Sequence, residues 1–204
     1  SPFPDAVRQL VFDPLGMTSS TFEQVDLPGD LEPRLAKAYR GGPVPLARDY
    51  VHTTPAAGLY TTAEDMGRFV AALLADDTWA VRQMKQTQFQ HGPFMSGRGF
   101  GLAEGRSHGY RTLHKDGQCS GFTARILLVP ELGVGWFSVQ NLSIFGRAGA
   151  ISRVNGMHRR LARELLAELW PEGPGQEIPS PRVAGPTKSF PVAPLAGTYR
   201  DTMD

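Results

Sequence analysis

Ten residues near the middle of the chain bring together several side chains that could take part in catalysis. The stretch LHKDGQCSGF, residues 113–122, holds a histidine, a lysine, an aspartate, two glycines and the only cysteine of the 204-residue sequence. Cys119 stands in a Gly-x-Cys-x-Gly pattern, which can mark a nucleophile turn. Alternatively, Lys115-Asp116-Gly117 forms part of a larger active site, or the whole stretch is an ordinary hairpin.

If Cys119 is a nucleophile, its turn must have a particular secondary structure on each side. In α/β-hydrolases such a turn lies between a strand and a helix. Here FTARILLVP follows, residues 122–130, which is rich in β-branched and aromatic residues and ends at a proline, so it predicts a strand. We therefore expect Cys119 to be a small apolar residue at a turn. A hydrolase built on Cys119 would require inhibition by thiol reagents and a base beside the sulfur.

Composition excludes several other classes of function. The net charge is +1 and 41% of the residues are apolar, which is typical of a globular domain and not of a nucleic-acid-binding protein. No apolar run approaches the roughly 20 residues of a membrane-spanning helix. The five histidines lack metal-ligand spacing, and neither Ser-x-x-Lys nor Gly-x-Ser-x-Gly occurs. The sequence thus indicates no metal, cofactor, nucleic acid or membrane span.

Apolar periodicity predicts the helices that must support the reactive stretch. Residues 4–13 predict a short helix, ended by Pro14 and Gly16. The clearest helix begins after Thr61 or Thr62, either of which can cap it. It is expected to bury one apolar stripe. The apolar residues of the first helix are Val7, Leu10 and Val11, and those of the second are Met66, Phe69, Val70, Leu73 and Leu74.

Two further helices are predicted later in the chain. One runs from about Trp79 to Thr87, and a long one follows Asn141 and stops at Pro171. The apolar residues that mark the long helix are Ile151, Val154, Met157, Leu161, Leu165, Leu166 and Leu169.

Between these helices the sequence predicts an antiparallel sheet. Residues 98–105, 110–117, 122–130 and 134–142 are short runs broken by glycine or proline, as in successive strands. Glu131-Leu132-Gly133 forms the turn between the last two. Helices packed on a mostly antiparallel sheet give an α+β fold.

The ends of the chain suggest three units. Residues 18–57 show little periodicity and predict a long surface segment. Residues 171–194 contain seven prolines and three glycines, which is linker composition. We therefore expect one domain at 1–170, a linker at 171–194, and the beginning of a small β domain at 195–204. Both ends look cut, so the first domain is expected to be incomplete at its N-terminus.

Four landmarks, in this order, carry a resemblance to a known family. They are FDPLGMTSSTF (residues 12–22), PAAGLYTTAEDMGRFVAALL (55–74), HKDGQCSGFTARILLVPELGVGWFSVQN (114–141) and the long helix. Together they resemble the second half of the β-lactamase-like serine hydrolases, which include class C β-lactamases, D-alanyl-D-alanine peptidases and related esterases. The match covers about residues 4–170. The tail LAGTYR resembles the opening of the small barrel domain that follows in some members.

The resemblance implies an active site in three parts. A serine in Ser-x-x-Lys attacks the acyl carbon, a Tyr-x-Asn/Ser element shares the proton transfers, and a Lys/His-Thr/Ser-Gly triad lies on a strand. The first two precede the first landmark in this family, and neither lies in this sequence. The chain is therefore expected to be a C-terminal part that is inactive alone and whose partner is the missing N-terminal segment of the same domain.

Lys115-Asp116-Gly117 stands where the family has Lys-Thr-Gly, at the expected distance from Gly121-Phe122. The resemblance implies that Lys115 supplies positive potential to a base, that Gly117 leaves room for substrate, and that the backbone N–H of Gln118 is an oxyanion donor. An alternative frame begins the triad at His114, which places Gly117 one residue too late.

Asp116 departs from the family pattern, because a carboxylate replaces a hydroxyl that helps to receive a substrate carboxylate. It would repel an anion and partly neutralise Lys115, so among ester, amide and β-lactam substrates we expect a neutral ester or amide.

The alternative to a hydrolase is a non-catalytic binding or scaffold protein on the same fold. The family is often exported to the periplasm or secreted, but an export signal would precede residue 1, so the location stays open.

Overall fold

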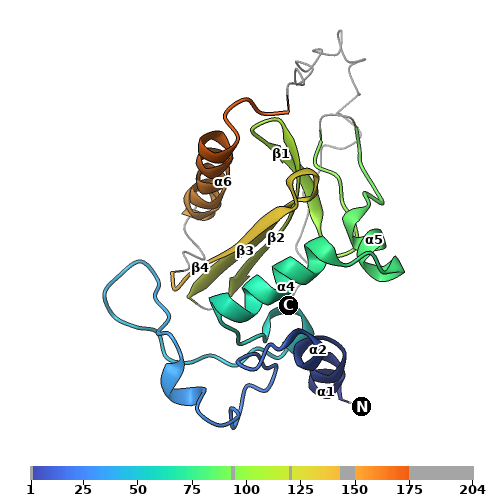
Figure 1. Cartoon of the computed structure of the whole chain (residues 1–204). Helices are drawn as coiled ribbons and strands as arrows, with labels where there is room; N and C mark the ends of the chain where they lie inside the picture. Colours follow the sequence, from blue (N-terminus) through green and yellow to red (C-terminus); the bar gives the residue numbers. More distant parts are fainter. Residues whose placement is uncertain (1, 93–94, 120, 143–149, 175–204) are drawn as a thin grey trace, which may run out of the picture.

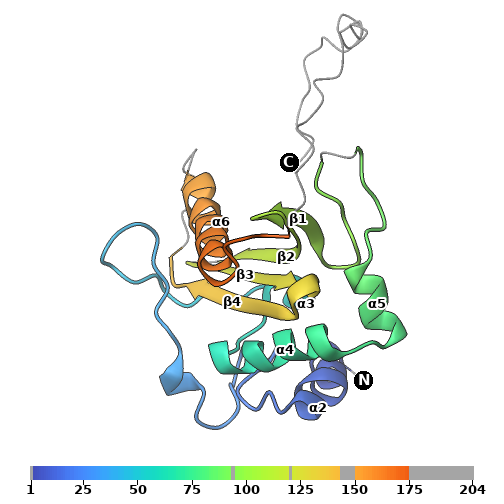
Figure 2. The same cartoon turned by 45° about the horizontal axis from the view of Figure 1, so that its top comes forward.

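The chain folds as helices packed on both faces of a four-stranded antiparallel sheet (Figure 1). The computed structural model describes residues 2–92, 95–119, 121–142 and 150–174, without the side chains of residues 150–155. The strand order is β1-β2-β3-β4, and Figure 2 shows α6 on one face of the sheet and α4 on the other. The predicted α+β class is confirmed. The strands are β1 (Ala103–Ser107), β2 (Tyr110–Cys119), β3 (Phe122–Val129) and β4 (Val134–Gln140).

Most of the predicted helices are found close to their expected places. No described helix has both the length and the apolar composition that crossing a membrane requires. Most of the linker and all of the expected small β domain lie outside the described residues. The helical elements are α1 (Phe3–Val7), η1 (Arg8–Phe12), α2 (Asp13–Leu15), η2 (Glu32–Arg34), α3 (Thr54–Ala57), α4 (Ala63–Ala75), α5 (Trp79–Lys85), η3 (Pro130–Leu132) and α6 (Ala150–Leu169).

Short turns connect the strands and fix their register. Ser107 pairs with Tyr110, and Cys119 pairs with Phe122, so each of the first two connections has two residues. The last connection is η3 followed by Gly133, whose φ of 63° is left-handed. Such tight connections leave the strands no freedom to slip, which sets the face to which every side chain of β2 points.

Helix α4 packs closely on the sheet through the predicted stripe. Met66, Val70 and Leu73 are buried, and Phe69 and Leu74 are partly buried, as the spacing predicts. The close approach needs glycine on the facing strand. A Cβ on Gly135 would lie 2.8 Å from the Leu127 carbonyl oxygen and 2.9 Å from Val70 Cγ1, so no other residue fits without displacing the helix.

Helix α6 covers the face of the sheet opposite to α4. It buries fewer of its apolar residues than the sequence pattern suggests. Among its described side chains, His158, Ala162 and Leu166 are buried, spaced four residues apart. Ala162 and Leu166 pack against Tyr110, Leu127 and Val129, whereas His158 hydrogen-bonds with Ser138 and Gln140 of β4. A helix lying across a sheet buries about one residue per turn in its centre, and the small Ala162 lets the backbone come close. Of the apolar residues that mark this helix, Met157, Leu161, Leu165 and Leu169 are exposed.

The first helix differs from its prediction in two respects. Leu10 is 78% exposed, because the π-helical turn at Arg8–Phe12 is wider than an α-turn and rotates the apolar face so that Phe12 is buried instead. Pro14 does not end the helix. It occupies the first turn of α2, where proline is tolerated, and Gly16 with φ 66° ends the helix.

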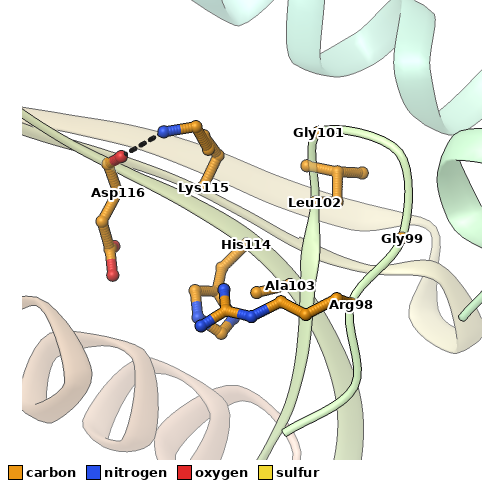
Figure 3. A pocket seen from close by; sticks show the side chains of 8 residues that line it. All are labelled: Arg98, Gly99, Gly101, Leu102, Ala103, His114, Lys115 and Asp116. Atoms are coloured by element: carbon orange, nitrogen blue, oxygen red, sulfur yellow. Dashed lines mark hydrogen bonds between the residues drawn. The ribbon is translucent and has the colours of Figure 1, made fainter. Parts of the chain in front are cut away.

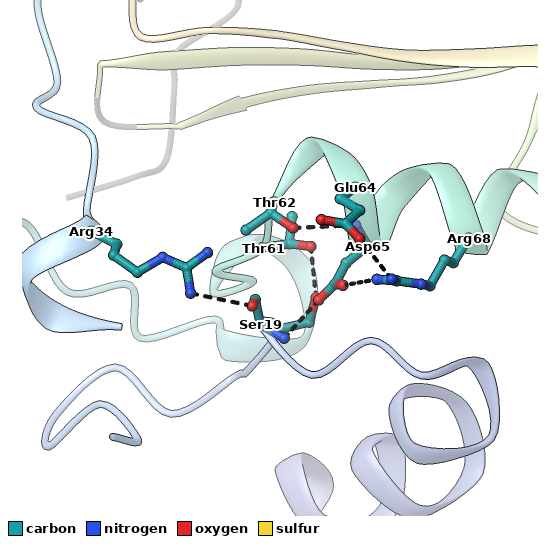
Figure 4. A network of polar contacts seen from close by, with 8 residues as sticks. Ser19, Arg34, Thr61, Thr62, Glu64, Asp65 and Arg68 are labelled. Carbon is teal, nitrogen blue, oxygen red and sulfur yellow. Dashed lines mark hydrogen bonds and ion pairs between the residues drawn. The ribbon is translucent and has the colours of Figure 1, made fainter. Parts of the chain in front are cut away.

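A buried carboxylate fastens the N-terminal loop to α4 (Figure 4). Asp65 is 2% exposed and accepts hydrogen bonds from Ser19 N and Ser20 Oγ, each at 2.8 Å. Arg68 Nη1 donates to its other oxygen at 2.8 Å. Thr62 is the cap of α4, since its hydroxyl accepts from Asp65 N, whereas Thr61 bonds to Ser20. This network ties the first sequence landmark to the second.

We predict that Asp65→Ala lowers the free energy of unfolding by about 2–4 kcal/mol, because the part-buried Ser19 N–H loses its acceptor and Arg68 loses its buried counter-charge. Glu64→Ala is the matched control. Glu64 also contacts Arg68, at 2.7 Å, but it is 77% exposed, so its loss should cost less than about 0.5 kcal/mol. Urea unfolding followed by tryptophan fluorescence measures both. Equal losses in the two variants would contradict a central role for Asp65.

Candidate active site

Strand β2 presents the reactive stretch on two opposite faces of the sheet. Successive side chains of a strand alternate in direction. Figure 3 shows His114 and Asp116 pointing toward the face covered by α6, while Lys115 points away from it. Lys115 and Asp116 are neighbours in sequence, but their charged groups do not meet.

One edge of β2 is open beside these residues. Strand β1 pairs with β2 only from Tyr110 to His114. From Lys115 to Cys119, β3 pairs with one edge, and within the described residues no strand pairs with the other. A hollow of about 310 Å³ lies next to this edge. It is lined by Arg98, Gly99, Gly101, Leu102, Ala103, His114, Lys115 and Asp116.

The ammonium group of Lys115 is held by the backbone and keeps its charge unpaired. Lys115 Nζ donates a hydrogen bond to the carbonyl oxygen of Asp116 at 2.7 Å. No ion pair to Lys115 is found in the described part of the chain. The lysine therefore supplies positive potential at the edge of the hollow, as a cleft lysine must.

The carboxylate of Asp116 is paired with Arg125 on the neighbouring strand. The two residues are cross-strand partners, and Asp116 Oδ1 lies 3.0 Å from Arg125 Nη1. The Arg125 side chain is 5% exposed and that of Asp116 is 35% exposed. Neither atom achieves hydrogen-bond geometry, so charge attraction holds the pair. The negative charge of Asp116 therefore neutralises the positive charge of the buried Arg125 and not that of Lys115.

His114 is neutral in this environment. Burial lowers its pKa to about 4, and the positive charges of Arg125, Arg98 and Arg159 act in the same direction, with Asp116 opposing them. Its Nδ1 atom is buried and has no hydrogen-bond partner. A neutral imidazole adds no positive charge to the hollow.

The two glycines of the stretch have different roles. A Cβ added to Gly117 would meet no atom within 4 Å, so the strand is bare where a substrate would lie. Gly121 has φ 83°, and a Cβ there would lie 2.9 Å from Tyr39 N and collide with Ala38. Gly121 therefore serves the hairpin and the approach of the loop, whereas Gly117 is required by neither. Gln118, the expected oxyanion donor, pairs with Thr123 of β3.

Cys119 is the last residue of β2, and β3 begins at Phe122 after a two-residue connection. The context is strand–turn–strand, so the nucleophile-turn interpretation is excluded, as its sequence context predicted. No group of three metal-ligating side chains is found among the described residues.

Two arginines near the site were not singled out from the sequence. Arg125 carried a signal, because it is the only charged residue in the apolar run 122–130 and a charge there demands a buried partner. Arg98 carried none, since an arginine in a glycine-rich run is usually a solvated surface residue.

Acid should destabilise the fold through His114. Because its folded pKa of about 4 lies below its ordinary 6.5, the unfolded chain binds the extra proton first. The contribution of His114 to the free energy of unfolding is therefore fully present above about pH 6.5. It is lost as the pH falls toward about 4, by at most about 3 kcal/mol. Burial also lowers the pKa of His158, which adds to the effect.

We predict that His114→Gln flattens the decline in urea-unfolding free energy between about pH 7 and about pH 4.5. His52→Gln removes an exposed histidine and serves as the control. An unchanged pH slope in His114→Gln would show that His114 does not cause the acid sensitivity.

The chain matches a family model and a human protein. A family model described as Beta-lactamase matches residues 1–152. A human protein described as "Putative beta-lactamase-like 1" is 30% identical over 139 residues, which make up 63% of this chain and 27% of that protein.

Solved structures of penicillin-binding and β-lactamase proteins share the fold. A β-lactamase from Sulfitobacter sp. EE-36 has a TM-score of 0.63 and 20% identity, covering 81% of this chain and 54% of that one. A β-lactamase/D-alanine carboxypeptidase from Yersinia pestis gives 0.60 and 22%, covering 81% and 50%. The octameric penicillin-binding protein homologue from Pyrococcus abyssi gives 0.58 and 20%, covering 75% and 37%.

The chain spans about half or less of the length of these proteins. The identities to the solved structures are low enough that they show the fold alone, but the family model covers most of the 204 residues. The chain belongs to the Beta-lactamase family.

Proposed function

We propose that this chain is the C-terminal part of a serine hydrolase that acts by acyl transfer on an ester or amide. The observation that carries the proposal is the open edge of β2, where Lys115 lines a hollow and Gly117 lies further along the same edge, with which no described strand pairs. An extended or planar acyl substrate can lie along such an edge and receive hydrogen bonds from the backbone.

Each residue of the edge has a role in this proposal. A serine from the upstream Ser-x-x-Lys segment would attack the acyl carbon, forming the serine ester, while its proton passes to the leaving alcohol or amine through a neighbouring base. Lys115 would favour the deprotonated form of that base. The backbone N–H of Gln118 would stabilise the oxyanion together with the N–H of the serine. Water then hydrolyses the serine ester.

The substrate preference expected from the sequence loses its physical basis. The sequence favours a neutral ester or amide, because Asp116 would repel an anion beside Lys115. The carboxylate instead lies 3.0 Å from Arg125 on the other face. Asp116 lines the hollow, but Arg125 offsets its charge, so the carboxylate opposes a negatively charged substrate less than the sequence suggests.

Open surfaces support a partner segment from the same domain. Among the described residues, β4 pairs only with β3, so its outer edge offers unpaired backbone groups. Helix α6 exposes four apolar side chains, of which Met157 and Leu169 are 51% and 61% exposed. The chain also spans only 27% of its human relative. An upstream segment that covered these surfaces would complete the sheet and bring the serine to the β2 edge.

A fluorophosphonate probe tests the proposal. We expect no adduct on this chain alone and one adduct in the full-length protein, on the serine of the upstream segment. An adduct on the isolated chain would mean that a complete site exists within it, and peptide mapping would identify the nucleophile. An unlabelled full-length protein would favour the non-catalytic alternative.

We predict that Lys115→Ala in the full-length protein lowers kcat/KM for a short ester about a hundredfold, because the base loses its electrostatic support. Arg160→Ala is the control. It removes the same charge from the exposed surface of α6, where Arg160 pairs with the exposed Glu164 at 2.7 Å. Equal activity of the Lys115→Ala variant and the parent would remove the lysine from the mechanism.

Alanine substitutions at Gly117 and Gly121 allow effects on activity and on stability to be compared. Gly121→Ala should lower the free energy of unfolding by more than about 1 kcal/mol, since alanine is strained at φ 83° and collides with the loop. Gly117→Ala should change it by less than about 0.5 kcal/mol, yet reduce ester turnover because the methyl group occupies the substrate's place. Urea unfolding and ester hydrolysis separate the two effects. Full activity of Gly117→Ala would contradict a substrate lying at this edge.

A further inference from the structure

Arg125 is a buried cation on the face of the sheet opposite to Lys115. It lies on β3 as the cross-strand partner of Asp116, and its side chain is 5% exposed. Burial lowers the pKa of Arg125, the carboxylate of Asp116 opposes this effect, and the positive charge of Arg159 adds to it. Among the described side chains, no carboxylate other than that of Asp116 lies within ion-pair distance of the guanidinium group. Arg125 therefore depends on Asp116 for its counter-charge.

Charge attraction alone joins the two facing atoms of this pair. Asp116 Oδ1 lies 3.0 Å from Arg125 Nη1, but neither atom has a hydrogen-bond partner in the described part of the chain, and Arg125 Nε has none there either. The Asp116 side chain is 35% exposed, so without its arginine the carboxylate would turn toward water. A buried arginine without its aspartate has no such escape, because its desolvation is then uncompensated. Loss of either partner therefore disturbs β2 at residue 116.

The backbone of Asp116 is also the anchor of the Lys115 side chain. Lys115 Nζ donates a hydrogen bond to the Asp116 carbonyl oxygen at 2.7 Å, and Figure 3 shows this contact beside the hollow. The side chain of Asp116 points to the other face, where it meets Arg125. Residue 116 thus connects an ion pair on one face of the sheet with the ammonium group on the other.

We propose that Arg125 is a positioning residue, which acts through Asp116 to hold the ammonium group of Lys115 at the open edge of β2. This inference rests on the proposed acyl-transfer function. Arg125 does not line the hollow, so it does not touch a substrate bound there. The pair also gives a reason for the aspartate at position 116, since a hydroxyl residue there would leave the buried arginine without its counter-charge.

Substitution of both partners in the full-length protein tests the coupling. Arg125→Met should lower kcat for a short ester about tenfold with little change in KM, because the lysine loses its fixed position. Asp116→Thr should have the same effect, although it restores the Lys-Thr-Gly pattern. The double variant should recover kcat to within about twofold of the parent, because removal of both charges leaves neither one buried without a partner.

A second ion pair on the same sheet provides the matched control. Glu104 on β1 pairs with Arg111 on β2 at 2.8 Å, and the two side chains are 22% and 27% exposed. Neither of them lines the hollow. Glu104→Thr should therefore change kcat by less than about twofold.

The Lys115→Ala background separates positioning from support of the fold. If Arg125 acts through Lys115, then Arg125→Met should lower kcat by less than about twofold once the lysine is absent. An equal loss of kcat with and without the lysine would show that Arg125 only supports the fold, and the inference would be wrong. Full activity of Arg125→Met in the otherwise unchanged protein would also overturn it.

The outcomes separate this inference from the proposed function. If the full-length protein hydrolyses no ester and forms no fluorophosphonate adduct, the proposed function fails. The position of Lys115 is then measured by NMR in the 204-residue chain, because an ammonium group held by a carbonyl oxygen exchanges its protons slowly enough to give an Nζ signal. That signal should disappear in Arg125→Met, with the amide signals of α4 unchanged, and return in the double variant. A parent chain without the signal, or an Arg125→Met chain that keeps it, overturns the inference.

Discussion

The two-residue alternation of β2 is the constraint on which the candidate site depends. β2 is paired with β3 from Leu113 to Cys119 and with β1 from Tyr110 to His114, and short turns at both ends prevent slippage, so the face of each side chain is fixed. One face receives His114 and Asp116, which lie under α6 with Arg125. The other receives Lys115. A shift of the register by a single residue would bury the lysine and expose the aspartate, and it would destroy both the buried pair and the cationic edge.

Two anchors hold the rest of the chain around this strand. The buried Asp65 network joins the N-terminal loop to α4, which itself packs on the sheet through Gly135. Gly121 allows residues 38 and 39 to approach the β2–β3 turn, and Tyr39 N donates to Asn141 at the end of the sheet. The long loop with little periodicity is therefore fastened near its start by a carboxylate and near its middle by a close backbone approach.

The sequence predicted the elements better than it predicted the directions of side chains. Strand and helix positions followed from apolar periodicity, and the turn at Gly133 from its composition, because these are local properties. The exposure of Leu10 could not be predicted, since a π-helical turn leaves no clear signal in sequence. The exposed side of α6 was equally hidden, because periodicity shows that a helix has an apolar stripe but not how much of it the sheet covers. The role of Asp65 as an anchor needed a partner 46 residues away.

The charges around β2 show that residues adjacent in a sequence motif need not interact with each other. In sequence, Asp116 stands between Lys115 and Gly117, and its charge seems to belong to the lysine. In a strand, adjacent residues point to opposite faces, and the residue that faces Asp116 is Arg125, across the ladder. A buried arginine demands a counter-charge more strongly than an exposed lysine does, because its desolvation is larger and water cannot compensate it. The aspartate is therefore best understood as the counter-ion of the core, which leaves the open edge of β2 with the lysine's charge intact. The carboxylate at position 116 therefore affects the interior of the sheet more than the field at the open edge of β2.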